Sequence, residues 1–193
     1  FTSIFSHYDL AKVQGSYIVK IPSTEIANIR LLDAIVDDQW DNDFFYHVIL
    51  STGASTIEEI DLAIKKLIDT TTRLTLMHCV SSYPCEFDKA NLSRIRTLQS
   101  RYGHTVDVGY SGHCPGIFDA IASLQFMPSM IEKHFTIDNN LPGRDNKFSI
   151  LPSDMKFLRQ YIDAEHDMMM SHGQDFQACE KEMRNVYRGR WDA

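Results

Sequence analysis

The sequence predicts an α/β protein built as part of a (β/α)8 barrel. Short runs rich in β-branched and aromatic residues alternate with amphipathic stretches, and the runs begin roughly 24 to 32 residues apart, the length of one βα unit. Polar residues gather where successive runs end, as expected when a site lies at the carboxyl ends of barrel strands. No glycine-rich phosphate loop follows any run, which disfavours a doubly wound nucleotide-binding sheet.

The predicted strands are short and mostly apolar. They span residues 17–21, 47–51, 74–80, 106–110 and 130–134, with residues 1–5 as one more candidate. Because βα repeats place parallel strands side by side, these segments should form one sheet. About six βα units are visible, whereas a closed barrel has eight. We expect the two missing strands to precede Phe1.

Amphipathic helices are expected between the strands. The run Ser55-Thr56-Ile57-Glu58 is typical of a capping box, and an apolar stripe follows it. Further helices are predicted over residues 91–102, 117–126 and 152–172. The last of them closes the predicted barrel domain, residues 1–172.

Composition and charge exclude several classes of protein. The net charge of −7 comes without a basic stripe, which argues against nucleic-acid binding. No apolar run reaches the roughly 18 residues of a membrane span, and the N-terminus lacks the features of a signal peptide. The four cysteines form no CxxC pair, so we expect free thiols in a reducing cytoplasm rather than a disulfide framework.

Two histidines are the best candidates for metal ligands. His113 and His134 each lie at or just past the end of a predicted strand, one βα unit apart, so a barrel would make them neighbours. Two imidazoles with open positions suit Mn²⁺, Zn²⁺ or Fe²⁺. The alternative is a pair of ordinary polar histidines. His78 lies within a strand and is interpreted as a core histidine with a hydrogen-bond partner. The other histidines are expected at the surface: His7, His47, His104, His166 and His172.

Three further segments carry groups that suit anions or hydroxyls. Lys20 and Ser23 end one strand and could meet a phosphate or carboxylate, although a surface lysine before a turn is the simpler interpretation. Ser51-Thr52-Gly53 precedes the capped helix and could seat an anion. Asp145 follows a Pro-Gly-Arg turn and could accept hydroxyl protons, or simply be solvated.

Taken together, six segments in register resemble the sialic acid synthase family (N-acetylneuraminate and related nonulosonate synthases). The order and spacing hold over about residues 3–162. The matching segments are Lys20-Ile21-Pro22-Ser23, Val48-Ile49-Leu50-Ser51-Thr52-Gly53, His78-Cys79-Val80-Ser81-Ser82-Tyr83-Pro84, Val108-Gly109-Tyr110-Ser111-Gly112-His113, Ile131-Glu132-Lys133-His134-Phe135-Thr136 and Pro142-Gly143-Arg144-Asp145.

The resemblance implies a TIM barrel that condenses phosphoenolpyruvate with N-acetylmannosamine or a related N-acetylated hexose and releases phosphate. It also implies a divalent metal on His113 and His134, Mn²⁺ first, with Mg²⁺ or Co²⁺ as alternatives. The residues implied to hold phosphoenolpyruvate are Lys20, Ser23, Ser51 and Ser111, with help from Ser3 and with Ser81 at a position where some members have asparagine. Tyr83 and Asp145 would contact the sugar. The implied catalytic residues are Glu25, His134 and Asp145.

The chain departs from the family pattern at several places. Ser111-Gly112-His113 replaces the Ser-Asp-His of many bacterial members, and Asn146 stands where histidine is frequent. The two first strands and the C-terminal antifreeze-like domain of the family are missing, so residues 173–193 are predicted to be a linker toward that domain. The resemblance implies a homodimer for the full-length form. We expect the isolated chain to be unstable or inactive.

Two rival functions remain open. A metal-dependent aldolase or isomerase barrel could use the same two histidines without phosphoenolpyruvate. A barrel remnant could bind a sugar without turnover. Phosphate release that depends on phosphoenolpyruvate separates both from a synthase.

Overall fold

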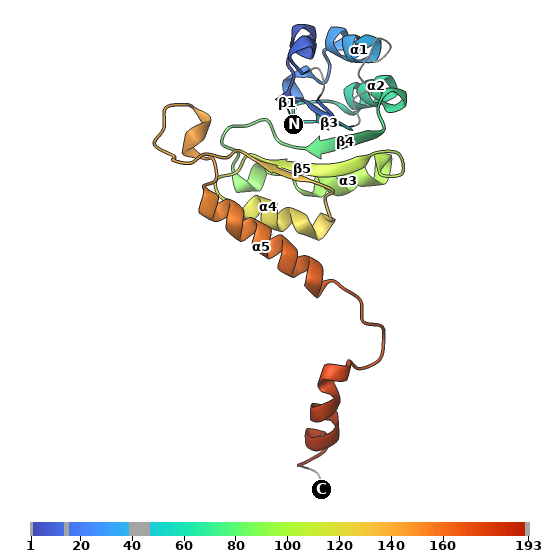
Figure 1. The fold of residues 1–193 in the computed structure, drawn as a ribbon, viewed down its shortest axis with the longest axis vertical. Coiled ribbons are helices and arrows are strands. Elements are labelled where there is room, and N and C mark those ends of the chain that lie inside the picture. The colour runs from blue at the N-terminus through green and yellow to red at the C-terminus, as the bar shows by residue number, and fades with distance from the viewer. Residues whose placement is uncertain (1, 14–15, 39–46, 192–193) are drawn as a thin grey trace.

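Six parallel strands lie side by side in the order in which they occur in the chain (Figure 1). The computed structural model describes residues 2–13, 16–38 and 47–191. Each strand pairs with the next through a crossover, so β1 and β6 are the edge strands. The strands are β1 (Thr2–Ser3), β2 (Ile18–Ile21), β3 (His47–Ser51), β4 (Arg73–His78), β5 (Asp107–Gly112) and β6 (Ile131–Lys133). This arrangement is a parallel α/β half-barrel.

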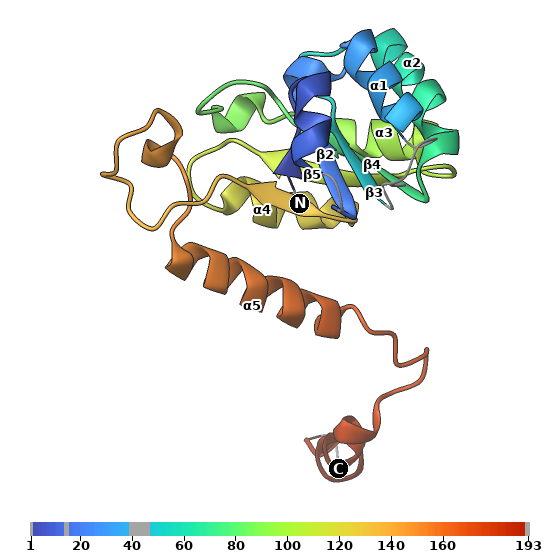
Figure 2. The ribbon, with the colours of Figure 1, turned by 45° about the horizontal axis from the view of Figure 1, so that its top comes forward.

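Five α-helices accompany the described strands, and Figure 2 shows α1 and α2 together beside the first strands, with α4 and α5 near the last. They are α1 (Ile29–Asp38), α2 (Ile57–Leu67), α3 (Ser93–Tyr102), α4 (Phe118–Ser123) and α5 (Pro152–Met168). Helix α1 is absent from the sequence-based prediction. Its signal is readable, however, because the Leu31 amide donates to Asn28 Oδ1 at its start and Leu31, Leu32 and Ile35 are buried.

Alternation along the strands divides the sheet into two faces. In β3, Val48 and Leu50 belong to the apolar core that the helices cover. Ile49 and Ser51 point the opposite way because successive side chains of a strand alternate. Ser51 lines a polar cavity on that second face. The helices therefore stabilise one face, and the other face carries the chemistry.

Most predicted strands lie where the structure has a strand, but one or both of their ends differ from the observed ends by one or two residues. The prediction 47–51 matches β3, whereas β2 begins at Ile18 and β4 ends at His78. Strand β5 continues two residues past the predicted end, to Gly112, and β6 is limited to Ile131–Lys133. Phe1 of the predicted strand 1–5 lies outside the described residues. His113 and His134 consequently each follow a strand directly.

Three predicted helices are shorter than expected. The segment 117–126 is α-helical only to Ser123, and a 3-10 turn over Leu124–Phe126 ends at Met127, whose φ is 49°. The segment 91–102 becomes helical at Ser93, because Asn91 has a φ of 47° that a right-handed helix does not allow. Helix α5 ends at Met168 rather than at residue 172.

The capping box of α2 lies one residue later than predicted. The Thr56 hydroxyl accepts from the Glu59 amide at 3.3 Å, and the Glu59 carboxylate accepts from the Thr56 amide at 2.8 Å. Ser55 donates instead to the Gly53 carbonyl. The four-residue spacing of the motif is preserved, and only its register differs from the prediction.

Replacing Thr56 with alanine is expected to lower the free energy of unfolding by about 1 kcal/mol, because the Glu59 amide loses its acceptor. Chemical denaturation followed by circular dichroism measures the change. Thr72→Ala, at an exposed residue outside any helix, serves as the control and should change stability by less than about 0.5 kcal/mol. An equal loss of unfolding free energy in the two variants would show that Thr56 does not stabilise α2 as its N-cap.

Two histidines, His78 and His47, are buried in the interior of the fold and do not line the cavity. His78 is fully buried and its Nε2 donates to the Ala90 carbonyl at 3.0 Å, which confirms the predicted core histidine. The prediction for His47 is wrong: it is 3% exposed and its Nε2 lies 2.8 Å from Thr75 Oγ1. Burial lowers the pKa of both rings, and Arg73 adds to the effect at His47.

A buried histidine with a lowered pKa makes stability fall in mild acid. Below about pH 6.5 the histidine ring becomes protonated in the unfolded chain but stays neutral in the folded protein. Because the unfolded state then binds more protons, lowering the pH shifts the equilibrium toward unfolding. Between pH 6.5 and 5.5, His78→Gln should therefore reduce the slope of unfolding free energy against pH by up to about 1 kcal/mol per pH unit. Denaturation at several pH values measures it. The exposed His172→Gln should leave the slope unchanged, and an unchanged slope in both variants refutes the prediction.

The chain after α5 leaves the sheet. Residues 169–191 are exposed almost throughout and end in a short π-helical turn, Met183–Tyr187, far from the strands in Figure 1. The domain boundary at residue 172 stays a prediction.

All four cysteines are free, and three of them, Cys79, Cys85 and Cys114, are buried. Among the described helices, none has the length and apolarity to cross a membrane.

Candidate functional site

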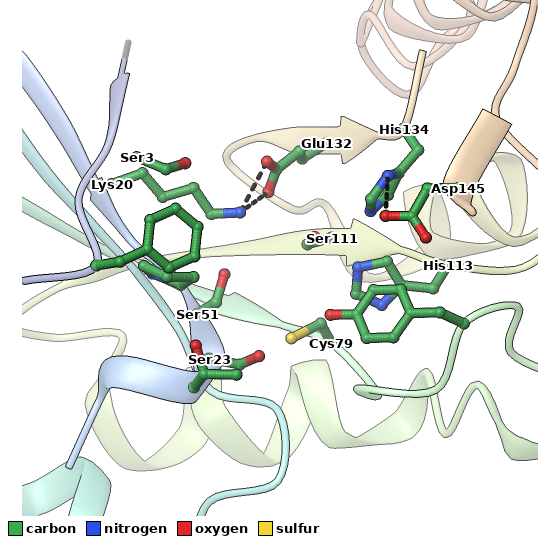
Figure 3. A pocket seen from close by; sticks show the side chains of 14 residues that line it. Ser3, Lys20, Ser23, Ser51, Cys79, Ser111, His113, Glu132, His134 and Asp145 are labelled. Atoms are coloured by element: carbon green, nitrogen blue, oxygen red, sulfur yellow. Dashed lines mark hydrogen bonds and ion pairs between the residues drawn. The ribbon is translucent and has the colours of Figure 1, made fainter. Parts of the chain in front are cut away.

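A polar cavity of about 330 Å³ opens at the carboxyl ends of the strands (Figure 3). Its walls come from β1, β2, β3, β5 and β6 and from segments that follow the strands, including the segment after β4. Nine of its lining residues are predicted site residues: Ser3, Lys20, Ser23, Ser51, Tyr83, Ser111, His113, His134 and Asp145. The remaining lining residues are Phe5, Pro22, Thr24, Cys79 and Glu132. The sheet thus brings together groups spread over most of the chain.

An ion pair spans the cavity from β2 to β6. Lys20 Nζ lies 2.7 Å and 2.6 Å from the two carboxylate oxygens of Glu132. Four strand spacings separate β2 from β6, which in a flat sheet would place them roughly 19 Å apart. Side chains of this length meet only if the sheet is strongly curved. The contact is therefore direct evidence that the six strands form part of a barrel wall.

Serine side chains line the cavity together with Lys20 (Figure 3). Ser23 Oγ lies 2.8 Å from Ser81 Oγ, so Ser81 contacts a residue of the cavity wall. Ser111 is buried on β5. Ser51 is 2% exposed, and its Oγ has no hydrogen-bond partner in the described structure. A buried hydroxyl without a partner is costly, so Ser51 Oγ is a candidate to hydrogen-bond a ligand or a water molecule in the cavity.

His113 is held in the form that binds metals. Its Nδ1 lies 2.8 Å from the Val80 carbonyl. A carbonyl can only accept, so Nδ1 carries the hydrogen and Nε2 keeps its lone pair. Burial lowers the pKa of His113, and the nearby His134 contributes in the same direction. The ring is consequently neutral at pH 7.

His134 lies beside His113, with ring centroids 5.4 Å apart. Burial also lowers the pKa of His134, partly offset by Asp145. The Asp145 carboxylate is 3.8 Å from His134 Nδ1, longer than a hydrogen bond. Phe148 packs against the His134 ring at 5.2 Å and fixes its position from the other side. Two neutral imidazoles thus share one corner of the cavity.

His113 and His134 are the residues of the cavity that could hold a divalent metal ion. With nitrogen–metal bonds near 2.1 Å, imidazoles on one ion have ring centres about 5 Å apart, close to the 5.4 Å between His113 and His134. Among the described residues, no cluster of three or more histidine, cysteine, aspartate or glutamate side chains suits a metal. The remaining positions would therefore fall to water or substrate, as in a catalytic site.

Tyr83 forms the wall next to the histidines. Its ring lies 4.4 Å from that of His113 and 6.4 Å from that of Phe148. Burial raises the pKa of its hydroxyl, so the phenol stays protonated and can donate a hydrogen bond to a ligand. Tyr83 and Asp145 therefore offer one donor and one acceptor on the side of the cavity that carries the two histidines.

One predicted catalytic residue lies apart from the cavity. Glu25 does not line it, and its carboxylate accepts from the Asn28 side chain at 2.8 Å. Sequence reasoning missed Glu132 in turn. The signal was present, because Glu132 precedes His134 by two residues in the predicted strand 130–134 and so should share its face. Cys79 also lines the cavity, and burial raises the pKa of its thiol.

Comparison with known proteins places this geometry in a family. The model of the NeuB family matches residues 1–174. The chain is 37% identical over 153 residues to N,N'-diacetyllegionaminic acid synthase of Campylobacter jejuni, covering 78% of this chain and 43% of the relative. It is 32% identical over 116 residues to N-acetylneuraminate-9-phosphate synthase of Drosophila melanogaster, covering 60% of this chain and 31% of that protein.

Solved structures agree with the fold. The N-acetylneuraminic acid synthetase of Leptospira borgpetersenii, solved with citrate, superposes with a TM-score of 0.79 at 33% identity, over 96% of this chain and 65% of that one. A phospho-2-dehydro-3-deoxyheptonate aldolase of Thermotoga maritima, at 17% identity and a TM-score of 0.68, shares the fold over 86% of this chain and 50% of its own.

The chain spans less than half the length of the curated relatives it matches, 43% of the Campylobacter protein and 41% of a Legionella pneumophila synthase of the same name. The matched family model nevertheless covers residues 1–174, and that range contains every residue that lines the cavity. On these grounds the chain belongs to the NeuB family of sialic acid, legionaminic acid and pseudaminic acid synthases.

Proposed function

We propose that this chain is part of a (β/α)8-barrel synthase that joins phosphoenolpyruvate to an N-acetylated hexose and releases phosphate. The relatives named as synthases of nonulosonic acids support this assignment. The observation that carries it is the two-sided cavity: a buried lysine among serines on one side, and two neutral histidines on the other. One side suits a small anion, and the other suits a metal-bound carbonyl.

Phosphoenolpyruvate would occupy the side of Lys20. The ammonium group and the hydroxyls of Ser23, Ser51 and Ser111 are donors that match phosphate and carboxylate oxygens. The unpartnered Ser51 Oγ gains a bond when the anion binds. Ser3 lines the same side. Lys20 Nζ contacts Glu132 in this structure, and in the proposal the phosphate takes the place of the Glu132 carboxylate there.

The sugar would occupy the side of the histidines. His113 and His134 would hold Mn²⁺, which when bound polarises the sugar aldehyde and lowers the pKa of a nearby water. Tyr83 can donate to a sugar oxygen and Asp145 can accept from a hydroxyl group. N-acetylmannosamine is the proposed acceptor.

The bond changes follow from the two substrates. Carbon 3 of phosphoenolpyruvate forms a bond to the aldehyde carbon, whose oxygen takes a proton. Water adds to carbon 2, the carbon–oxygen bond to phosphate breaks, and the water oxygen becomes the new keto oxygen after losing its protons. The Glu132 carboxylate, released from Lys20, can accept one of these protons. A catalytic role for Glu25 and a role for Ser81 in binding phosphoenolpyruvate are also part of the proposal, and both rest only on the resemblance to the family.

Phosphate release tests the proposal. The complete gene product is incubated with phosphoenolpyruvate, Mn²⁺ and N-acetylmannosamine, and inorganic phosphate is measured. Release that requires both sugar and metal is expected. A folded protein that releases no phosphate with any of several N-acetylated hexoses would overturn the proposal. Aldol cleavage without phosphoenolpyruvate would instead support the metal-dependent aldolase.

A further inference from the structure

A buried charged network lies directly behind the two histidines. Lys133 Nζ contacts the two carboxylate oxygens of Asp119 at 2.9 Å and 3.0 Å. The Tyr110 hydroxyl donates to the same carboxylate at 3.0 Å. The side chains of Lys133 and Asp119 are 2% and 1% exposed, so water reaches neither charge. The network joins β5, α4 and β6.

The network also touches the backbone beside each histidine. Lys133 immediately precedes His134 on the chain. Its Nζ donates a further hydrogen bond, at 2.7 Å, to the carbonyl of Cys114, the residue that follows His113. A single ammonium group therefore links the chain segments that carry the two rings.

The lysine network and the cavity occupy opposite faces of the same strand pair. Gly112 on β5 pairs with Lys133, and the neighbouring pair is Ser111 with Glu132, which point into the cavity. A Cβ atom at Gly112 would collide with the Asp119 carboxylate and approach the Lys133 side chain. Glycine at this position makes the room that the network occupies.

Stability alone is a weak reason for such a pair. Removing two charges from water costs several kcal/mol per ion, and replacing a buried ion pair by apolar side chains of similar size is often neutral or stabilising. The pair does supply directional bonds that fix geometry. One of these bonds ends at the Cys114 carbonyl, next to His113 in the chain, and Lys133 itself is next to His134.

We propose that Lys133 and Asp119 are positioning residues that hold His113 and His134 at the separation that a shared metal ion requires. The inference rests on the proposed metal site. Neither residue touches a substrate, because both lie on the helix-covered face of the sheet.

Paired apolar replacement separates positioning from stability. The double variant Lys133→Met with Asp119→Leu removes both charges together, so that no buried charge is left unpaired. Its melting temperature reports folding, calorimetric titration with Mn²⁺ alone reports affinity, and nitrogen-15 NMR of the histidine rings reports which ring nitrogen of His113 carries hydrogen. Lys156→Met, at an exposed position of α5, is the matched control.

The double variant is expected to fold, to bind Mn²⁺ on the order of tenfold more weakly, and to show shifted ring signals for His113 and His134. The control should match the original protein. A folded double variant with unchanged affinity and ring signals would overturn the inference. If the double variant does not fold, Asp119→Asn, which keeps the side-chain shape, decides in the same way. The ring signals can be recorded on a protein that shows no catalytic activity. Failure to release phosphate would therefore refute the proposed synthase, while the positioning of the histidines could still be tested.

Discussion

Replacing His134 with alanine is expected to lower metal-dependent phosphate release by about a thousandfold. The change removes one of two imidazoles, and among the described side chains no third ligand is grouped with them. Metal polarisation of a carbonyl contributes several kcal/mol to transition-state stabilisation, and each 1.36 kcal/mol is a factor of ten in rate. Steady-state phosphate release at several Mn²⁺ concentrations, together with calorimetric Mn²⁺ titration, measures the effect.

The matched control for this change is His104→Ala, because His104 is an exposed histidine distant from the cavity lining. It should leave both Mn²⁺ affinity and phosphate release unchanged. If His134→Ala kept more than a tenth of the activity at saturating Mn²⁺, the histidine pair would not be the metal site. The pair would then be a packed aromatic cluster with Tyr83 and Phe148.

Replacing Lys20 with methionine is expected to raise the KM for phosphoenolpyruvate between about tenfold and a hundredfold. A hydrogen bond to a charged group contributes about 1.5–3 kcal/mol, and methionine keeps the length of the side chain without its charge. The KM for the sugar should change much less, because the sugar is proposed to bind at the histidine side. Initial rates with each substrate varied in turn measure the two constants.

Glu132, which contacts Lys20, allows a control for the Lys20→Met experiment. Lys20→Met leaves the Glu132 carboxylate without the ammonium group that it contacts. The double variant Lys20→Met with Glu132→Gln removes that unpaired charge. If Lys20 binds phosphate, the KM stays high in the double variant. Recovery of the original KM would show that Lys20 serves only to hold Glu132. Lys89→Met, at an exposed lysine, controls for loss of charge.

Much of the cavity could be predicted because parallel strands carry their chemistry at one end. The positions of Ser51 and His113 at strand ends follow from pattern alone, and curvature of the sheet then brings them together. Alternation would also have identified Glu132, since it shares a face with His134. Its contact with Lys20 could not be predicted, because 112 residues separate the two and only the curved sheet joins them.

Burial of individual polar residues was the weakest part of the prediction. His47 was expected at the surface, yet it begins β3 and reaches Thr75 on the neighbouring strand inside the sheet. Nothing local in the sequence distinguishes it from an exposed histidine at a strand start. Glu25 does not line the cavity, and its carboxylate accepts a hydrogen bond from Asn28 three residues later, so its catalytic role stays a prediction.

The sequential strand order has a consequence for how the protein is made. Each strand pairs with the one synthesised just before it, so the sheet can grow on the ribosome in the order of translation. Among the described strands, β6 is synthesised last, and it brings Glu132 and His134 with it. A nascent chain that ends before residue 131 can pack the first five strands yet holds only half of the histidine pair. The contact between Lys20 and Glu132 and the pairing of the two histidine rings can therefore form only after β6 has joined β5.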